Sequence, residues 1–226
     1  MSDNLQLWNH VFATDPSQTK GFKRQGGFSG TAIKPLYLTQ KATALWGPMG
    51  DAWGAETVEY LIHRDAVYLK ARLWYPGKNG RATIEHWGGD VLMKGEGKPN
   101  DEAFKMAFTD AIGKCLVQLG FSADVHLGLF DDSKYVQDVA RKETAKSRNA
   151  RFTELKEGLL ASDDPAAYWH EHLTAINEFK TQDKQFYSDL AQAGKARRKQ
   201  LDDAQQLRES HGEGFSETPT EYLDVE

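Results

Sequence analysis

Two stretches of alternating apolar and polar residues, 56–63 and 66–75, constrain the fold of this chain most strongly. Successive side chains of a β-strand point to opposite faces, so this alternation predicts strands with one buried face. The short Arg64-Asp65 link suits a hairpin, and the turn residues 76–80 lead to a third expected strand at about 81–92. The sequence therefore predicts a three-stranded antiparallel meander, whose expected inward residues on the first two strands are Val58, Tyr60, Ile62, Val67, Leu69, Ala71 and Leu73.

A long amphipathic helix after the meander is the second strong signal. Apolar residues recur at helical spacing over residues 101–119, where Asn100 or Asp101 can cap the start. The expected buried stripe of this helix consists of Phe104, Phe108, Ile112, Cys115, Leu116 and Leu119. A shorter helix is expected to begin at Pro35 and to stop at the Gly47-Pro48 turn.

These elements predict an α+β fold: a helix, a three-stranded antiparallel meander and a long helix, which together form a β-β-β-α core. From residue 133 onward the chain is strongly charged and helical in pattern. We therefore expect a folded core at residues 1–136, a charged helical extension at 137–211 and a disordered acidic tail at 212–226.

A sheet of three strands covered by one helix has one protected face and two open edges. Such a unit is expected to continue its sheet, or to pack its helices, against a neighbouring subunit. The sequence therefore predicts that the chain self-associates.

Charge is segregated along the chain. The net charge is -5, but residues 213–226 hold five acidic residues and no basic one, so residues 1–212 balance at 28 of each sign. Residues 16–50 contain five basic residues and no acidic one, and residues 141–151 contain five basic residues and one acidic one. The acidic total therefore does not exclude a polyanionic partner.

Basic and aromatic residues are interleaved where the N-terminal arm, residues 1–30, leads into the first helix. Within residues 20–37 these are Lys20, Phe22, Lys23, Arg24, Phe28, Lys34 and Tyr37. Sequence-independent binding of a single strand uses cations along the phosphates and flat side chains against the bases. Because a stacked base contributes only about 1–3 kcal/mol, such a binder gains affinity by presenting many copies in a multimer.

Four blocks of the sequence, in this order, are similar to the motifs of one known family. They are Lys34-Pro35-Leu36-Tyr37, the aromatic-glycine turn from Trp46 to Trp53, the helical segment from Ala107 to Leu116, and the segment from Asp131 to Val136. With the meander between them, these blocks resemble the Rad-fifty-two family of single-strand annealing proteins and its phage-encoded relatives. The resemblance covers roughly residues 20–136.

The resemblance implies a β-β-β-α unit that forms rings or helical filaments with a basic groove for single-stranded DNA. The implied activity is ATP-independent annealing of complementary strands in homologous recombination or phage DNA repair, without catalysis and without a cofactor. A host single-strand-binding protein is a further partner to consider for the C-terminal region. The single cysteine, Cys115, and the lack of a signal-like start or a long apolar run indicate a cytoplasmic protein without a membrane partner, in the bacterial host if phage-encoded.

The expected DNA-binding residues are Lys20, Lys23, Arg24, Lys34, Tyr37, Lys105 and Lys114. The last four of these occupy the family positions, two at the start of the first helix and two on the long helix. The family's paired lysine and arginine become Gly113-Lys114 here, which predicts a less basic groove. Lys105 and Lys114 are nine residues apart, about half a turn around the helix axis, so they cannot face one groove wall.

Several of these residues have a structural alternative. Tyr37 could be a core residue, and Lys114 could be an edge side chain whose stem covers apolar surface. The basic cluster from Arg141 to Arg151 could be an exposed helix face or a secondary DNA surface. Trp46 and Trp53 are expected to pack in the core.

Two other functions remain open. Glu85, His86 and Asp90 near one strand end could serve a metal-dependent DNA-processing nuclease, and the C-terminal helices could make the chain a protein–protein adaptor of a replication or recombination complex. His170 and His172 point about 200° apart on a helix, so they cannot share a metal ion. The chain has no Walker-type phosphate loop, which predicts no ATP site.

The acidic tail, residues 213–226, has three readings. It could compete with DNA for the basic groove, or dock onto a partner protein through its acidic-aromatic end Glu221-Tyr222-Leu223-Asp224. It could also simply keep the chain in solution.

Overall fold

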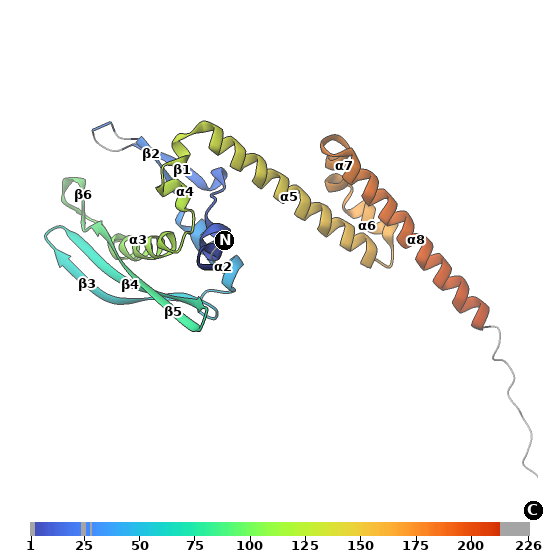
Figure 1. Ribbon diagram of the computed structural model, residues 1–226, viewed down its shortest axis with the longest axis horizontal. Coiled ribbons are helices and arrows are strands. Elements are labelled where there is room, and N and C mark those ends of the chain that lie inside the picture. The colour runs from blue at the N-terminus through green and yellow to red at the C-terminus, as the bar shows by residue number, and fades with distance from the viewer. Residues whose placement is uncertain (1–2, 24–25, 28, 213–226) are drawn as a thin grey trace, which may run out of the picture. The chain divides into compact units, whose positions relative to one another are not determined.

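The structure, a computed structural model, describes residues 3–23, 26–27 and 29–212. The chain divides into two compact units between Glu143 and Thr144, inside the long helix α5 (Ser133–Ala161). Figure 1 labels helices and strands of both units, and each unit has its own hydrophobic core. The division falls a few residues after position 136, where the sequence places the end of the core.

The N-terminal unit contains the predicted meander. Strands β3 (Gly54–His63), β4 (Ala66–Gly77) and β5 (Gly80–Val91) form an antiparallel sheet in the order β3-β4-β5. The inward face of β4 is buried as the alternation predicts, at Val67, Leu69, Ala71 and Leu73. The predicted α+β fold is therefore confirmed.

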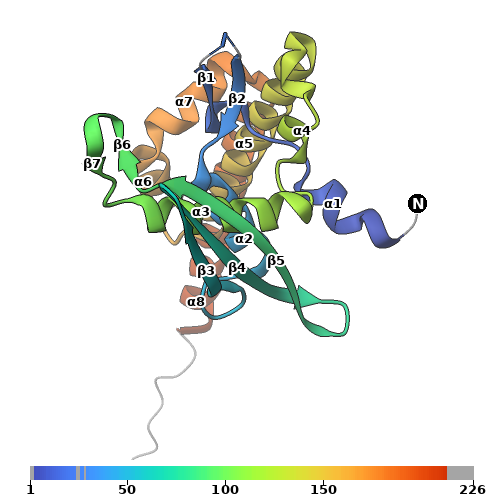
Figure 2. The ribbon, with the colours of Figure 1, turned by 90° about the vertical axis from the view of Figure 1, so that its left-hand side faces the viewer.

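The same face of β3 is not covered. Tyr60 and Ile62 lie opposite the buried Leu69 and Val67, but they are 61% and 51% exposed. Helix α3 (Ala103–Gln118), labelled beside the sheet in Figure 2, packs mainly on β4 and β5 and leaves this face of β3 largely exposed. The prediction that all the inward residues of β3 are buried is therefore wrong.

Helix α3 crosses the sheet on small side chains. Ala103, Ala107 and Ala111 are fully buried against β4 and β5. A Cβ atom added at Gly88 of β5 would lie 2.1 Å from the carbonyl oxygen of Ala107 and 2.4 Å from the nitrogen of Ala111. The backbones of helix and strand therefore approach so closely that the strand has room only for glycine at position 88, and the facing side of the helix has room only for alanine.

The predicted apolar stripe of this helix is partly wrong for the same reason. Cys115 and Leu116 are buried, and Phe108 and Ile112 pack partly against the core. Phe104, however, is 44% exposed. The large side chains lie on the flanks of α3, because its closest line of contact with the sheet has room only for alanine.

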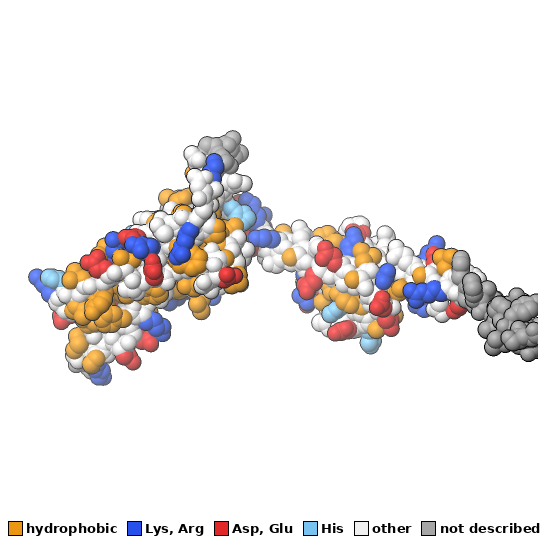
Figure 3. Space-filling view, turned by 90° about the horizontal axis from the view of Figure 1, so that it is seen from below, with side chains coloured by type: hydrophobic (Ala, Val, Ile, Leu, Met, Phe, Trp, Pro, Cys, Tyr) orange, Lys and Arg blue, Asp and Glu red, His pale blue; other side chains and the backbone are white. Residues whose placement is uncertain are grey.

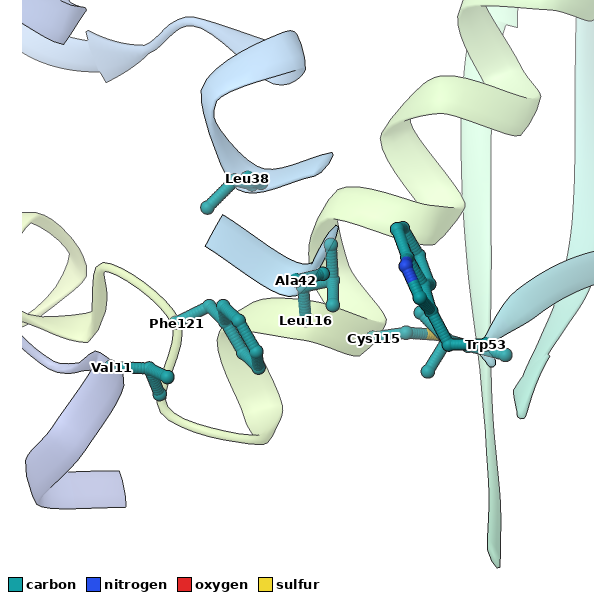
Figure 4. Close-up of a cluster of buried hydrophobic side chains, with 8 residues drawn as sticks. Val11, Leu38, Ala42, Trp53, Cys115, Leu116 and Phe121 are labelled. Carbon is teal, nitrogen blue, oxygen red and sulfur yellow. The ribbon is translucent and has the colours of Figure 1, made fainter. Parts of the chain in front are cut away.

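A second core joins the end of α3 to the N-terminal helices. Helices α1 (Gln6–Val11) and α2 (Pro35–Trp46) pack here, and Figure 4 shows Leu38 and Ala42 of α2 near Leu116 and Phe121. The predicted start of α2 at Pro35 is confirmed.

The aromatic residues of the Trp46–Trp53 turn belong to this core. Trp53 is fully buried, and its indole nitrogen donates to the carbonyl oxygen of Gly47 at 3.1 Å. Trp46 stacks on Tyr75 with ring centroids 5.2 Å apart. The prediction that Trp46 and Trp53 are packing residues is confirmed.

The thiol of Cys115 should make the stability of this unit depend on alkaline pH. Burial raises its pKa from 9.0 to about 11. A thiol with a raised folded-state pKa stabilises the fold fully below its unfolded pKa and loses that contribution as pH rises through the folded value. At 1.36 kcal/mol per pKa unit, the free energy of unfolding should fall by roughly 2 kcal/mol between pH 9 and 11 in urea titrations. Because Tyr37 and Tyr135 also have raised pKa values, a Cys115→Ala variant should lose roughly 2 kcal/mol less than the wild type over this range. An equal loss in both proteins would contradict the expectation.

The N-terminal segment is more ordered than the sequence predicts. Strands β1 (Thr19–Lys23) and β2 (Ser29–Ile33) form an antiparallel hairpin, with Phe22 opposite Gly30. The sequence reading of residues 1–30 as an arm did not include this hairpin. A five-residue strand that contains a glycine has no alternation long enough to be recognised.

Asp124 ties three segments of this unit together. It lies in the short helix α4 (Ala123–His126) and is fully buried. Its carboxylate accepts the backbone N–H of Thr14 at 2.8 Å and the hydroxyl of Tyr135 at 2.9 Å. Burial, together with the neighbouring carboxylate, raises the pKa of Tyr135. The N-terminal segment, α4 and the start of α5 are thus held at one buried charge.

The C-terminal unit is helical, as the sequence predicts. It contains the end of α5, then α6 (Pro165–Glu171), α7 (Leu173–Gln182) and α8 (Lys184–Gly212). Its core consists of Leu155, Leu159, Ile176, Phe179 and Leu190. The predicted helix at residues 195–211 is part of α8. The disorder predicted for the acidic tail concerns residues outside the described part, apart from Gly212 at the end of α8.

The remaining elements are short. A two-stranded ribbon pairs β6 (Met93–Lys94) with β7 (Lys98–Pro99). Single 3-10 turns lie at Asp3–Leu5, Pro16–Gln18, Gly95–Gly97 and Leu129–Asp131. None of the described helices has the length and apolar content that crossing a bilayer requires.

Candidate nucleic-acid interface

A groove of about 730 Å³ lies between the β1–β2 hairpin and one side of α3. The hairpin contributes Phe22 and Ala32, and the opposite wall is a face of α3 that runs from Met106 to Gln118. The start of α2 contributes Pro35 and Leu38, and two further elements contribute one residue each, His86 of β5 and His126 of α4. We call this the hairpin–α3 groove. Its helix wall is about 18 Å long at 1.5 Å per residue, which a few nucleotides can span.

Lys114 places a positive charge in this groove. Its Nζ atom lies 2.7 Å from an oxygen of Asp110, one helical turn earlier, and 3.4 Å from the carbonyl oxygen of Trp87. Asp110 also accepts the backbone N–H of Gly89 at 3.1 Å. A phosphate bound here would therefore compete with Asp110 for the lysine.

Lys105 does not line the groove. It forms an ion pair with Glu102 on a different side of the same helix. This placement agrees with the helical spacing, which separates Lys105 from Lys114 by about half a turn. Of the two helix lysines predicted to bind DNA, the structure brings only Lys114 to the hairpin–α3 groove.

The hairpin lysines face opposite sides of their strand. Lys20 shares a face of the hairpin with Phe22 and Ala32, both of which line the groove. Lys23 lines a separate hollow of about 470 Å³ that also includes Asp131. The predicted site residue Arg24 lies outside the described residues, as does Phe28.

Lys34 and Tyr37 hold the N-terminal segment onto α2. The Lys34 ammonium donates to the carbonyl oxygen of Ser17 at 2.9 Å, and the Tyr37 hydroxyl accepts the backbone N–H of Asp15 at 3.2 Å. Burial raises the pKa of Tyr37, and the Lys41 ammonium lies 5.4 Å from the centre of its ring. These contacts support a positioning role for both residues, and their direct contact with DNA stays a prediction.

Two histidines are groove residues that the sequence pattern did not single out for DNA binding. His86 and His126 are 40 positions apart in the chain. Both line the groove because α4 packs beside β2. Imidazole can donate hydrogen bonds to phosphate.

The three residues considered for a nuclease do not converge. Glu85 pairs with Lys70 and Arg72 at 2.7 Å each on the outer face of the sheet, and these cations lower the pKa of Glu85. His86 lies on the opposite face, in the groove, and Asp90 is four residues further, about 13 Å along the strand. Within the described residues no group of three side chains is arranged to hold a metal ion.

Two arginines of the basic cluster on α5 form ion pairs within the C-terminal unit. Arg151 pairs with Glu178 of α7 at 3.1 Å, and Arg148 lies 4.0 Å from Asp183 at the end of α7. These contacts favour the structural interpretation of Arg148 and Arg151.

An exposed apolar patch flanks the bare edge strand β3. It consists of Tyr60, Ile62 and Phe104, and the rings of Tyr60 and Phe104 meet edge to face with centroids 5.9 Å apart. We call it the edge patch; hydrophobic side chains are also seen gathered on the surface of this unit in Figure 3. Among the described strands of this sheet, β3 and β5 each have one unpaired edge.

Comparison with known proteins yields no assignment. No protein-family model matches the chain, and no curated protein matches it closely enough in sequence to count as a relative. Its function therefore has to be inferred from its own residues and their geometry.

Proposed function

We propose that this chain binds single-stranded DNA in the hairpin–α3 groove and, as a homo-oligomer, promotes annealing of complementary strands without ATP. The observation that carries the proposal is the composition of this groove, where Lys114, His86 and His126 lie beside the aromatic Phe22 and apolar side chains. The Rad-fifty-two-like blocks include both the start of α2 and the helix that forms the groove wall, which supports the same function.

The groove is better suited to binding single-stranded DNA than to reading base edges in a duplex. Its cations are few, so they can neutralise only a few phosphates, and its apolar wall offers contacts for bases that are not paired. No arrangement of side chains for reading base edges is needed, because every base presents a flat face to an aromatic ring. Binding that is independent of sequence is what an annealing protein requires.

Self-association supplies what one groove lacks. Short grooves in neighbouring copies would form a longer track, and the affinity of such a track rises through the high effective concentration of each further site. The edge patch and the free strand edges supply apolar surface and unpaired backbone groups for contact between copies. Annealing then needs no bond to be made or broken, since the oligomer holds the backbones and raises the rate at which complementary strands meet.

Substitution of Lys114 tests the groove directly. Each phosphate contact on a single strand steepens the dependence of log affinity on log salt by roughly 0.7, so Lys114→Ala should flatten the slope by about that amount. Asp110→Asn should strengthen binding, because it removes the carboxylate that competes for Lys114. The measurement is fluorescence anisotropy of a labelled oligonucleotide across a salt series, with mass photometry on the same samples.

Lys105→Ala is the matched control for this experiment. It removes the same charge from the same helix outside the groove, so the slope should not change. An equal flattening in both variants would count against the hairpin–α3 groove. Incubation with magnesium or manganese distinguishes the nuclease alternative, since an annealing protein leaves the lengths of labelled strands intact.

A further inference from the structure

A second groove, of about 240 Å³, lies in the C-terminal unit between α6 and α8. Pro165, Ala166 and Trp169 of α6 form its apolar side. Residues of α8 that lie on one helix face complete it, namely Ala191, Gly194, Lys195 and Arg198. We call it the α6–α8 groove. It combines an aromatic wall and a floor of small residues with two cations.

Gly194 keeps this groove open although packing does not require a glycine there. A Cβ atom at Gly194 would lie 3.7 Å from Leu159 and 3.9 Å from the ring of Trp169, which are ordinary contact distances. Glycine inside a helix costs about 1 kcal/mol relative to alanine. Glycine therefore makes α8 less stable than alanine would, at a position where a larger side chain would partly fill the space beside Trp169.

The two cations are available to a ligand. Lys195 and Arg198 are exposed, and within the part of the chain that the structure describes neither forms an ion pair. Their neighbour Arg197, by contrast, donates to the carbonyl oxygen of Ser162 at 2.9 Å and pairs with Asp163. An apolar groove with two unpaired cations suits an acidic peptide that carries an aromatic or aliphatic side chain.

We propose that the α6–α8 groove binds the acidic-aromatic segment of this same chain, residues 217–226. This segment has four acidic residues and no basic one, and Tyr222 and Leu223 stand between Glu221 and Asp224. The apolar pair is suited to the wall at Trp169, and the acids on either side of it to the two cations. The inference concerns the C-terminal unit and does not depend on DNA binding.

The segment is long enough to reach the groove. From Arg198 to the end of α8 at Gly212 is about 21 Å of helix at 1.5 Å per residue. The nine residues 213–221 can span up to about 30 Å when extended. The chain can therefore return along α8 and place residues 221–224 at the groove of the same copy.

A dye on the segment reports whether it is bound. Thr220→Cys supplies a single labelling site in the full-length chain, because the native Cys115 is buried and its pKa is raised to about 11. The dye should show high fluorescence anisotropy when the segment is docked. Gly194→Leu, which fills the groove, should lower the anisotropy to that of an unbound segment. Gln192→Leu adds the same side chain at an exposed position of α8 outside the groove, so it should leave the anisotropy unchanged.

Exchanging the charges of the groove and the segment distinguishes a specific loss of docking from misfolding of a variant. Lys195→Glu with Arg198→Glu should release the segment, and adding Glu221→Lys with Asp224→Lys should restore the high anisotropy. An anisotropy that neither change affects would overturn the proposal, as would release without restoration. Release of the segment by an oligonucleotide but not by Gly194→Leu would also overturn it, since the segment would then occupy the hairpin–α3 groove.

Discussion

Replacing Gly88 with alanine should remove about 3 kcal/mol or more from the free energy of unfolding of the N-terminal unit. The added Cβ would lie 2.1 Å from the carbonyl oxygen of Ala107 and 2.4 Å from the nitrogen of Ala111. Both are backbone atoms, so no side-chain rotation relieves the contact. The helix has to move away from the sheet, and the buried contacts of Ala103, Ala107 and Ala111 loosen together.

Urea unfolding followed by tryptophan fluorescence measures this loss, because Trp46 and Trp53 lie in the core of the same unit. Gly113→Ala in α3 is the matched control. A Cβ there meets only Leu38, at 3.7 Å, so alanine should stabilise the helix by up to about 1 kcal/mol. If Gly88→Ala unfolds at the same urea concentration as the wild type, the close approach of helix and strand described here is incorrect.

On the proposed function, Ile62→Lys should dissociate the proposed homo-oligomer and weaken binding of long single strands by about 10²–10⁴-fold, the range over which avidity acts. The substitution places a charge in the edge patch, where burial against another copy would require its desolvation. Ile62 is half exposed within one copy, so the fold itself should tolerate the lysine. The added positive charge favours DNA, and a loss of affinity therefore cannot come from electrostatics.

Leu61→Lys provides the comparison on the same strand. Leu61 has nearly the same exposure as Ile62 but lies on the opposite face of β3, beside Tyr68. We expect this variant to keep its oligomeric mass in mass photometry and its affinity for a long oligonucleotide. Dissociation by Leu61→Lys alone would place the contact between copies on the outer face of the sheet.

The meander and the two main helices of the N-terminal unit could be predicted because their signals are local. The alternation of β4 and the helical periodicity of residues 101–119 arise from which face of an element is buried, and each can be seen within one short window. The hairpin of β1 and β2 could not be predicted in this way. Its strands are only five residues long, and each of them contains a glycine.

The candidate site was predictable only in part. Lys20 and Lys114 were identified from charge and from motif resemblance, and the structure places one on the hairpin and the other on the groove wall. Lys34 and Tyr37 matched the same motifs, yet their polar atoms bind the backbone of the N-terminal segment. His126 carries no signal in the sequence, because its position in the groove depends on contacts of α4 with a distant strand.

The sequence by itself determined the types and the order of the meander strands and the main helices, because side-chain periodicity and turn residues act over a few neighbouring positions. Only the tertiary structure decided which side of each element is covered. The alanine contact of α3, the bare face of β3 and the groove beside the hairpin all depend on how closely two backbones approach. That distance is set by small residues such as Gly88, whose effect is visible only when the partner element is in place.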